Sequence, residues 1–285
     1  ATPSGLGGIA GHANSPLTDN TSIAVYAGDL LGNLWRYDIN GNIGAAGYDA
    51  QLLASFRDAS NNVQSIQAEP TVITKDGVTI VLAGTGRFLG TSDVANVNFQ
   101  SFYAVKDAMG STTHGAIRTV ANGFVQQTLT SGTCPNDPAN PFCLPGQLVR
   151  TSSSIAVDWT TNNGWYVDFL TGGERAATNP ALQLGTLLFT TITPVSNNAN
   201  ACGLSSGTAD SFIYALDYAT GGAVQGSGGV SGVSLGSGFA TAPIFVKLAD
   251  GSVIFASELK GLLAHTSLRR EIDPLAVEDY LAWGY

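Results

Sequence analysis

The chain has 285 residues with a formal net charge of −9, and only 12% of its residues are charged. The negative net charge and the lack of a run of basic residues exclude a surface that binds the phosphate backbone of nucleic acids, so we expect no nucleic-acid partner. No apolar run reaches the roughly 18 residues of a transmembrane helix, so we expect no membrane span. A hydrophobic content of 44% with 35 glycines indicates a secreted all-β protein with a substantial core.

Short runs of β-branched and aromatic residues, bounded by Gly, Asn, Asp and Pro, predict strands along the whole chain. In chain order the predicted strands are 23–27, 34–39, 71–74, 79–84, 101–106, 165–169, 186–192, 211–216, 242–248 and 252–257. Turn sequences such as Asn-Gly at 40–41 join several of them, because Asn and Gly tolerate the positive φ of tight turns. Helix signals are almost absent.

Two patterns recur along the chain. Residues 101–110 and 211–222 both resemble 25–42, in that a strand ends in Asp and is followed by a Gly-containing turn. Residues 70–90 and 242–263 share a second pattern of Pro, strand, polar turn and strand. One hairpin plus another strand pair makes a blade of a β-propeller. We therefore predict an all-β fold of about four blades, which form part or all of a larger ring.

The blades account for residues 1–267, with residues 268–285 as a carboxyl-terminal tail. Residues 108–164 and 193–210 are interpreted as long insertions on loops. The Gly/Ser-rich run 222–238 is predicted to be flexible. The chain starts at Ala1 without an initiating Met, so we expect a processed or cloned start within a longer protein.

Cys134 and Cys143 enclose eight residues rich in Pro, Asn and Asp, and this spacing predicts a disulfide in an oxidising compartment. Two free thiols are the alternative, and zinc is disfavoured because no His lies nearby. Cys202 is left over, either as a buried thiol, as a thiol that pairs with a partner, or as a competitor for one of the other two.

The stretch VYAGDLLGNLWRYD, residues 25–38, predicts two strands around a polar turn. Asp29 would accept hydrogen bonds from turn amides, and Gly32 would take the positive φ. Asn33 completes the turn, and Trp35 would pack between sheets. We therefore interpret these four residues as structural. No catalytic residue is predicted, because no nucleophile motif or metal-ligand spacing of histidines appears.

Other polar groups were weighed as sites. Asp38, Asn40 and Asn42 imitate the start of a calcium loop, but the Asn-Gly hairpin turn is the favoured interpretation. Arg87, in the Gly-rich stretch 83–90, is expected on a local carboxylate or carbonyl. Asp158 and Asp168 are the right residue type for a glycosidase pair, and we favour a turn-rich hairpin instead.

Four phrases occur in one order along the chain: YAGDLLGNLWRYD, GTGRFLGTSD with QSFYAVKD, GWYVDF followed by GER, and SFIYALDYATGG. Together they resemble the carboxyl-terminal domain of the PilY family, called PilC in some bacteria, whose members are adhesin and assembly proteins at the tips of type IV pili. The resemblance spans residues 20–222 and, more weakly, 238–265. It implies a β-propeller that is extracellular, at the pilus tip, after passage through the periplasm and outer membrane.

The resemblance implies a function through surfaces rather than catalysis. Minor pilins would bind one side, pilus assembly or extension would be supported, and loops would contact a host or abiotic surface ligand. We expect the adhesive loop at residues 122–150, with its Cys134–Cys143 bridge. In the tail, Leu275, Tyr280, Leu281 and Trp283 are the candidate partner contact; docking on the propeller itself is the alternative.

Many members of the family carry an Asp-rich calcium loop before the YAGD strand. The equivalent stretch here has one carboxylate, Asp19, and Pro16 and Leu17 stand where ligands and a Gly would be wanted. Its other polar residues are His12, Asn14, Ser15, Thr18 and Asn20. We expect that calcium binding is lost, with a remnant site on Asp19 and carbonyl groups as the alternative.

Two other functions remain open from the sequence. A quinoprotein-like propeller enzyme shares the IYALDYATGG type of repeat, but it would need a quinone and a calcium site with several carboxylates. A free-standing secreted binding propeller or adhesin would need neither cofactor nor pilus. Co-purification with pilins separates the last hypothesis from a pilus-tip protein.

Overall fold

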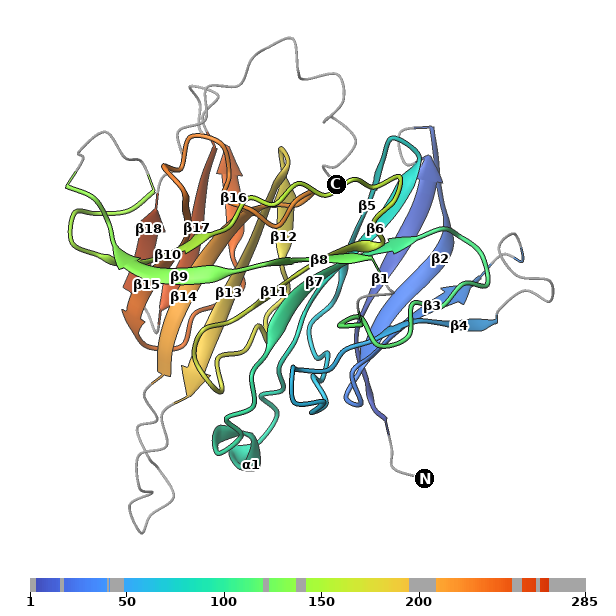
Figure 1. The fold of residues 1–285 in the computed structure, drawn as a ribbon, viewed down its shortest axis with the longest axis horizontal. Helices are drawn as coiled ribbons and strands as arrows, with labels where there is room; N and C mark the ends of the chain where they lie inside the picture. Colours follow the sequence, from blue (N-terminus) through green and yellow to red (C-terminus); the bar gives the residue numbers. More distant parts are fainter. Residues whose placement is uncertain are drawn as a thin grey trace.

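The computed structural model describes residues 4–15, 18–39, 41, 49–119, 123–136, 142–194, 209–247, 253–259 and 262–266. Within them the chain forms eighteen strands and one short helix, α1 (Thr91–Val94). The strands make four sheets that stand side by side across the molecule (Figure 1). No helix in the described ranges is long and apolar enough to cross a membrane.

The first two sheets contain the amino-terminal half of the chain. The first has the order β1 (Leu6–Ser15), β2 (Asp19–Asp29), β3 (Asn33–Asp38) and β4 (Ala50–Ser55). The second has the order β5 (Thr71–Lys75), β6 (Val78–Gly84), β7 (Ser101–Asp107), β11 (Gly164–Asp168) and β8 (Phe124–Gln127).

The other two sheets follow in the carboxyl-terminal half. The third has the order β12 (Ala181–Gln183), β13 (Thr186–Pro194), β14 (Ala209–Asp217), β15 (Val230–Ser237), β10 (Leu148–Ser152) and β9 (Leu129–Thr133). The fourth has β16 (Ile244–Lys247), β17 (Val253–Leu259) and β18 (Leu262–Thr266). The ten predicted strands coincide with β2, β3, β5, β6, β7, β11, β13, β14, β16 and β17 to within a few residues.

The recurring Asp occupies the same place in three sheets. β3, β7 and β14 are each the third strand of their sheet, and they end in Asp38, Asp107 and Asp217. Each carboxylate accepts a hydrogen bond from a backbone N–H two or three residues further on, at 2.8–3.0 Å. Such Asx turns stop a strand and start the next connection. The repeat in the sequence is therefore a repeat of sheets, as expected for propeller blades.

The second sheet is buried on both faces. Along β6, Ile80 and Leu82 belong to one core cluster while Val81 and Ala83 belong to another. Because side chains alternate across a strand, the two clusters lie on opposite faces of the sheet. This explains why the stretch VTIVLAG is apolar at nearly every position, as a strand buried on both faces requires.

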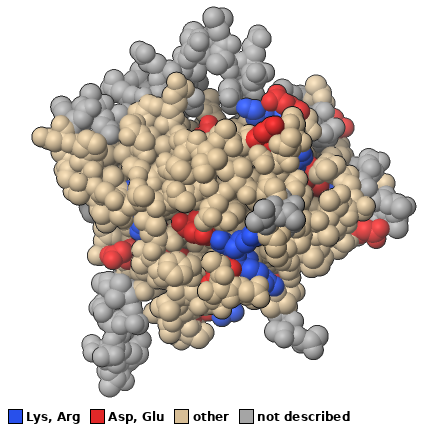
Figure 2. All heavy atoms as spheres, in the orientation of Figure 1, with Lys and Arg blue, Asp and Glu red and all other residues tan. Residues whose placement is uncertain are grey.

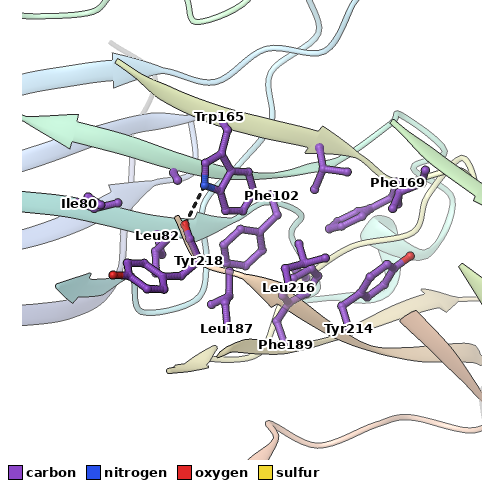
Figure 3. Close-up of a cluster of buried hydrophobic side chains, with 14 of the residues drawn as sticks. Ile80, Leu82, Phe102, Trp165, Phe169, Leu187, Phe189, Tyr214, Leu216 and Tyr218 are labelled. Carbon is purple, nitrogen blue, oxygen red and sulfur yellow. Dashed lines mark hydrogen bonds between the residues drawn. The ribbon is translucent and has the colours of Figure 1, made fainter. Parts of the chain in front are cut away.

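Aromatic rings fill the space between the second and third sheets (Figure 3). Phe102 of β7 stacks on Phe189 of β13 with centroids 4.3 Å apart, and Phe189 stacks on Tyr214 of β14 at 4.9 Å. Trp165 is fully buried, and its indole N–H donates to the Tyr218 carbonyl at 2.8 Å. These contacts pack the second sheet against the third.

Two predictions about loops were wrong in part. Residues 108–164 are not one insertion on the surface, since β8, β9 and β10 lie there and extend the second and third sheets. The supposedly flexible run 222–238 contains β15, in which Val230 and Val233 are buried. Gly232 serves close packing, because a Cβ there would lie 2.8 Å from the Tyr214 ring. Residues 195–208, within the other predicted insertion, lie outside the described residues.

The segment from β8 to β9 crosses between two blades, in front of the sheets in Figure 1. β8 pairs in parallel with β11 of the second sheet, and β9 pairs antiparallel with β10 of the third. The stretch predicted as an adhesive loop, 122–150, therefore contains three strands. It holds neighbouring blades together at their outer edges.

The predicted disulfide is confirmed. Cys134 and Cys143 are bonded, and both are buried in the core cluster of the third sheet beside Phe142 and Val149. The bond joins the end of β9 to the loop that leads into β10. Cys202 lies outside the described residues.

Replacing Cys134 and Cys143 by Ser should lower the free energy of unfolding by roughly 2–3 kcal/mol. Without the bond, the unfolded chain is no longer closed into a ten-residue loop, so its conformational entropy is higher. Urea unfolding of the wild type and the double variant, both without reductant, measures the difference. Equal stabilities would contradict a structural role for the bond.

A buried ion pair also joins β10 of the third sheet to the loop between β11 and β12. Arg150 of β10 donates to Glu174 at 3.2 Å, and both side chains are at least 96% buried. Thr191 and Tyr214 each donate to the other carboxylate oxygen of Glu174 at 2.8 Å. Burial raises the pKa of Tyr214 well above its ordinary value, so its hydroxyl remains a donor. The guanidinium of Arg150 lies 4.3 Å from the centroid of the Phe212 ring.

Glu174→Gln should destabilise the fold by about 3–5 kcal/mol, because it leaves the buried Arg150 charge without a counter-charge. Arg87→Gln is the control, because Arg87 also pairs with a carboxylate, Asp93 at 2.7 Å, but the Arg87 side chain is 42% exposed. Asp93 is the local carboxylate that the sequence predicted for Arg87. The loss on Arg87→Gln should stay below about 1 kcal/mol. Thermal and urea unfolding measure both variants. Equal losses in the free energy of unfolding would contradict a special role for the buried Arg150–Glu174 pair.

Candidate functional site

The turn after β2 is organised by Asp29, whose side chain is buried. One carboxylate oxygen accepts the backbone N–H groups of Leu31 and Asn33, both at 2.9 Å. The other accepts the Asn33 side-chain amide and the Trp35 indole N–H, both at 3.0 Å. All the capacity of Asp29 is therefore used inside the turn, which leaves little for a ligand.

Gly32 fits the turn as predicted, whereas Trp35 does not lie where the sequence predicted it. Gly32 has φ +77°, and a Cβ there would lie 2.7 Å from the Gln64 carbonyl oxygen, so only glycine fits. Trp35 is half-buried. Its neighbours Leu34 and Arg36 face the second sheet, so Trp35 points to the opposite face and does not pack between these two sheets.

Two of the weak metal candidates, Asp19 and Asp38, lie within the described residues. Asp19 is exposed and accepts the Thr21 backbone N–H at 3.0 Å, and hydrogen bonds from Thr21 lower its pKa. Asp38 is buried at the end of β3. Among the described residues no group of three or more His, Cys, Asp or Glu could hold a metal ion. Asn40, Asn42 and the tail residues Leu275, Tyr280, Leu281 and Trp283 lie outside the described residues.

Asp29→Ala should lower the free energy of unfolding by about 2–4 kcal/mol, because two turn amides and an indole N–H lose their acceptor. Asp19→Ala is a matched control at an exposed turn and should change it by no more than about 0.5 kcal/mol. Urea unfolding decides between a structural Asp29 and one kept for a ligand, since the second interpretation expects stability to be unchanged or improved.

A cleft opens where the crossing segment leaves the second sheet. Residues 126–129, 168–170 and 58–60 line it, together with Phe99 and Arg118. Its volume is about 340 Å³. The cleft forms because β8 and β11 run in parallel and then separate, one continuing toward the third sheet and the other toward Leu170. We call these residues the fork cleft.

The fork cleft has an apolar floor and rim. Leu129 and Phe169 are buried in the core between the second and third sheets and form its floor. Phe99 is 50% exposed and Leu170 is 39% exposed. Exposed aromatic surface at the rim of a hollow is typical of binding sites rather than of plain protein surface.

Arg118 and Asp168 form the polar wall of the fork cleft. The guanidinium makes a two-pronged ion pair with the carboxylate, one bond of which runs from Nη1 to Oδ2 at 2.9 Å. It lies flat over the Tyr166 ring, 4.6 Å from the centroid. Burial opposes the charge, but hydrogen bonds to Asp168 and Tyr103 raise the pKa of Arg118 overall. Arg118 is therefore a permanent, fixed cation.

A buried network holds this wall in place. Ser101 donates to Asp168 at 2.5 Å and accepts from Arg118 at 2.9 Å. Gln64 donates to the Ser101 hydroxyl at 2.8 Å and to the Phe99 carbonyl at 2.9 Å, which fixes the backbone of the rim. The wall is thus preorganised by residues of the core.

The sequence indicates two parts of the fork cleft. Residues 126–129 lie within the predicted adhesive stretch 122–150, and Asp168 is the residue paired with Asp158 as a glycosidase candidate. The structure does not support that pair, because Asp168 ends β11 whereas Asp158 lies in the turn before β11, and the five-residue strand alone spans roughly 16 Å. Asp158 accepts the Thr160 backbone N–H in its own turn. Phe99 and Arg118 gave no signal in the sequence, because they meet the other lining residues only through the path of the crossing segment.

One face of the molecule, drawn in Figure 2, carries little charge. On the face drawn in Figure 2 most atoms belong to uncharged residues, with small groups of acidic and basic atoms beside one another. Such a surface favours partners that are recognised by shape complementarity and by hydrogen bonds between uncharged groups.

Comparison with known proteins shows what the chain is similar to. The chain matches no protein-family model. It is 29% identical over 259 residues to the type IV pilus biogenesis factor PilY1 of Pseudomonas aeruginosa strain PAO1, covering 76% of this chain and 21% of that protein. A PilY1 homolog of Xylella fastidiosa strain Temecula1 is 28% identical over 250 residues, covering 82% of this chain and 18% of that protein.

The fold agrees with a solved structure. The crystal structure of the Pseudomonas aeruginosa PilY1 C-terminal domain superposes with a TM-score of 0.69 at 22% identity, covering 94% of this chain and 61% of that one. The chain is a relative of the PilY1 carboxyl-terminal domain. Its four sheets are the blades of a propeller-like fold shared with PilY1. The chain spans about a fifth of the length of the curated PilY1 relatives that it matches.

Proposed function

We propose that the chain is the carboxyl-terminal propeller module of a type IV pilus biogenesis factor and that it works by binding rather than by catalysis. The observation that carries this proposal is the similarity to PilY1 proteins over three quarters of the chain, in the same fold. Those relatives are named as pilus biogenesis factors, which supports a non-enzymatic role.

The finer part of the proposal concerns place and partners. The module lies outside the cell at the pilus tip, binds minor pilins and presents its outer surface to a host or abiotic ligand. Cores on both faces of the second sheet make a stiff scaffold, and recognition sites usually lie at the edges and loops of such scaffolds. The tail, residues 268–285, remains the candidate minor-pilin contact.

The chemistry of the fork cleft also supports binding rather than catalysis. A general base needs a carboxylate that is free to take a proton from a substrate. The Asp168 carboxylate accepts four hydrogen bonds, from Ser101, Gln126 and both terminal nitrogens of Arg118. It is therefore committed to the fold.

Deleting the coding region for residues 1–285 in the source bacterium should abolish or strongly reduce surface pili, and the wild-type region should restore them. A variant with Ala at Leu275, Tyr280, Leu281 and Trp283 should fail to restore pili and should not retain minor-pilin ectodomains in a pull-down. Val97→Ala, at an exposed residue that is not part of the tail sequence, is the control. Full piliation of the deletion strain, counted by electron microscopy, would contradict the proposal.

A further inference from the structure

We propose that the fork cleft binds a neutral saccharide ring, stacked on Phe99 and hydrogen-bonded by the uncharged polar groups around it. This inference rests on the adhesive part of the proposed function and names the chemical class of the surface ligand. The fork cleft would be the site at which the propeller recognises and binds a glycan.

The charged groups of the fork cleft favour a neutral ligand. Arg118 and Asp168 neutralise each other, and their hydrogen-bonding capacity is almost wholly used within the protein. Asp58 accepts the Ser60 backbone N–H at 2.9 Å and two bonds from Asn62 at 2.8 Å. An anionic ligand would meet two carboxylates and one cation that is already paired. Each carboxylate oxygen of Asp58 and Asp168 already accepts at least one hydrogen bond within the protein, so a metal ion would have to displace these donors.

Uncharged polar groups are available instead. The hydroxyls of Ser60 and Thr128 and the side-chain carbonyl of Gln126 line the cleft, are exposed, and have no hydrogen-bond partner among the described residues. Hydroxyls both donate and accept, as do the hydroxyls of a sugar. These three groups come from two segments on either side of the cleft, so one ring can contact both sides.

The rim supplies the apolar half of a saccharide site. A pyranose ring has one face of C–H groups, which carry slight positive charge and match the negative face of an aromatic ring. Phe99 offers half of its surface to solvent, and Leu170 lies beside it in the lining. A volume of about 340 Å³ is at the small end of ligand sites, which span roughly 300–1,000 Å³. One or two sugar rings fit this size.

The site is rigid before a ligand arrives. Gln64 holds the Phe99 carbonyl, the Asp58 turn holds Ser60, and Gln126 donates to Asp168 at 3.3 Å. Rigid groups lose little entropy on binding, which matters for weak, repeated contacts such as surface adhesion.

The test uses the purified chain with methyl glycosides of glucose, galactose, mannose and N-acetylglucosamine. Saturation-transfer NMR and calorimetry should detect at least one of these at millimolar concentration, and sialyllactose should not bind more tightly. Phe99→Ala should weaken binding about tenfold through loss of stacking. Gln126→Ala should weaken it several-fold. Val97→Ala, an exposed apolar change outside the lining, should leave it unchanged.

Thermal unfolding checks that each variant is folded, and Phe99→Leu keeps an apolar side chain without the aromatic face in case the alanine variant is not. Binding of no neutral glycoside by the wild type overturns the proposal. Preference for sialyllactose, or equal affinity in the wild type and in the folded Phe99 and Gln126 variants, overturns it as well.

The same variants separate this proposal from the function on which it rests. A strain with Phe99→Ala and Gln126→Ala should make normal pili and attach less to beads coated with the bound glycoside. Normal attachment overturns the saccharide site while leaving pilus biogenesis intact. Failure of the pilus function would show instead as full piliation after deletion of the whole chain.

Discussion

Burial of sheets on both faces is the constraint on which the rest of the structure depends. The second sheet stands between two others, so each of its central strands must give alternate residues to two different cores. Phe102 faces Phe189 in one core, while Tyr103 stacks on Phe56 in the other with centroids 4.0 Å apart. This arrangement leaves no sheet face of the second blade for function. Binding is therefore confined to turns, edges and the segments that cross between blades.

Polar groups in this chain are used mainly to end strands and to join blades. The Asp residues that end β2, β3, β7 and β14 accept hydrogen bonds from turn amides, and the Arg150–Glu174 pair joins β10 to the loop before β12. The crossing segment is the exception. Where it leaves β11, the sheets separate and expose uncharged polar groups beside Phe99. The fork cleft is thus a geometric consequence of how two blades are connected.

The strands, the blade repeat and the disulfide could be predicted from the sequence, because each depends on residues that are close together in the chain. β-branched runs, the Asp that ends β7 and β14, and the spacing of Cys134 and Cys143 are local signals. The crossing segment could not be predicted, since β8 pairs in parallel with β11, which lies beyond β9 and β10 in the chain. For the same reason Arg118 and Phe99 were missed, and the glycines of β15 were misread as a sign of flexibility.

The proposed place of this module is the tip of the pilus. Immunogold electron microscopy of isolated pili, with antibody raised against residues 1–285, tests this proposal. We expect gold at one end of each pilus and none in a strain that lacks the chain. Gold that is absent from pili, or is spread evenly along them, would contradict it.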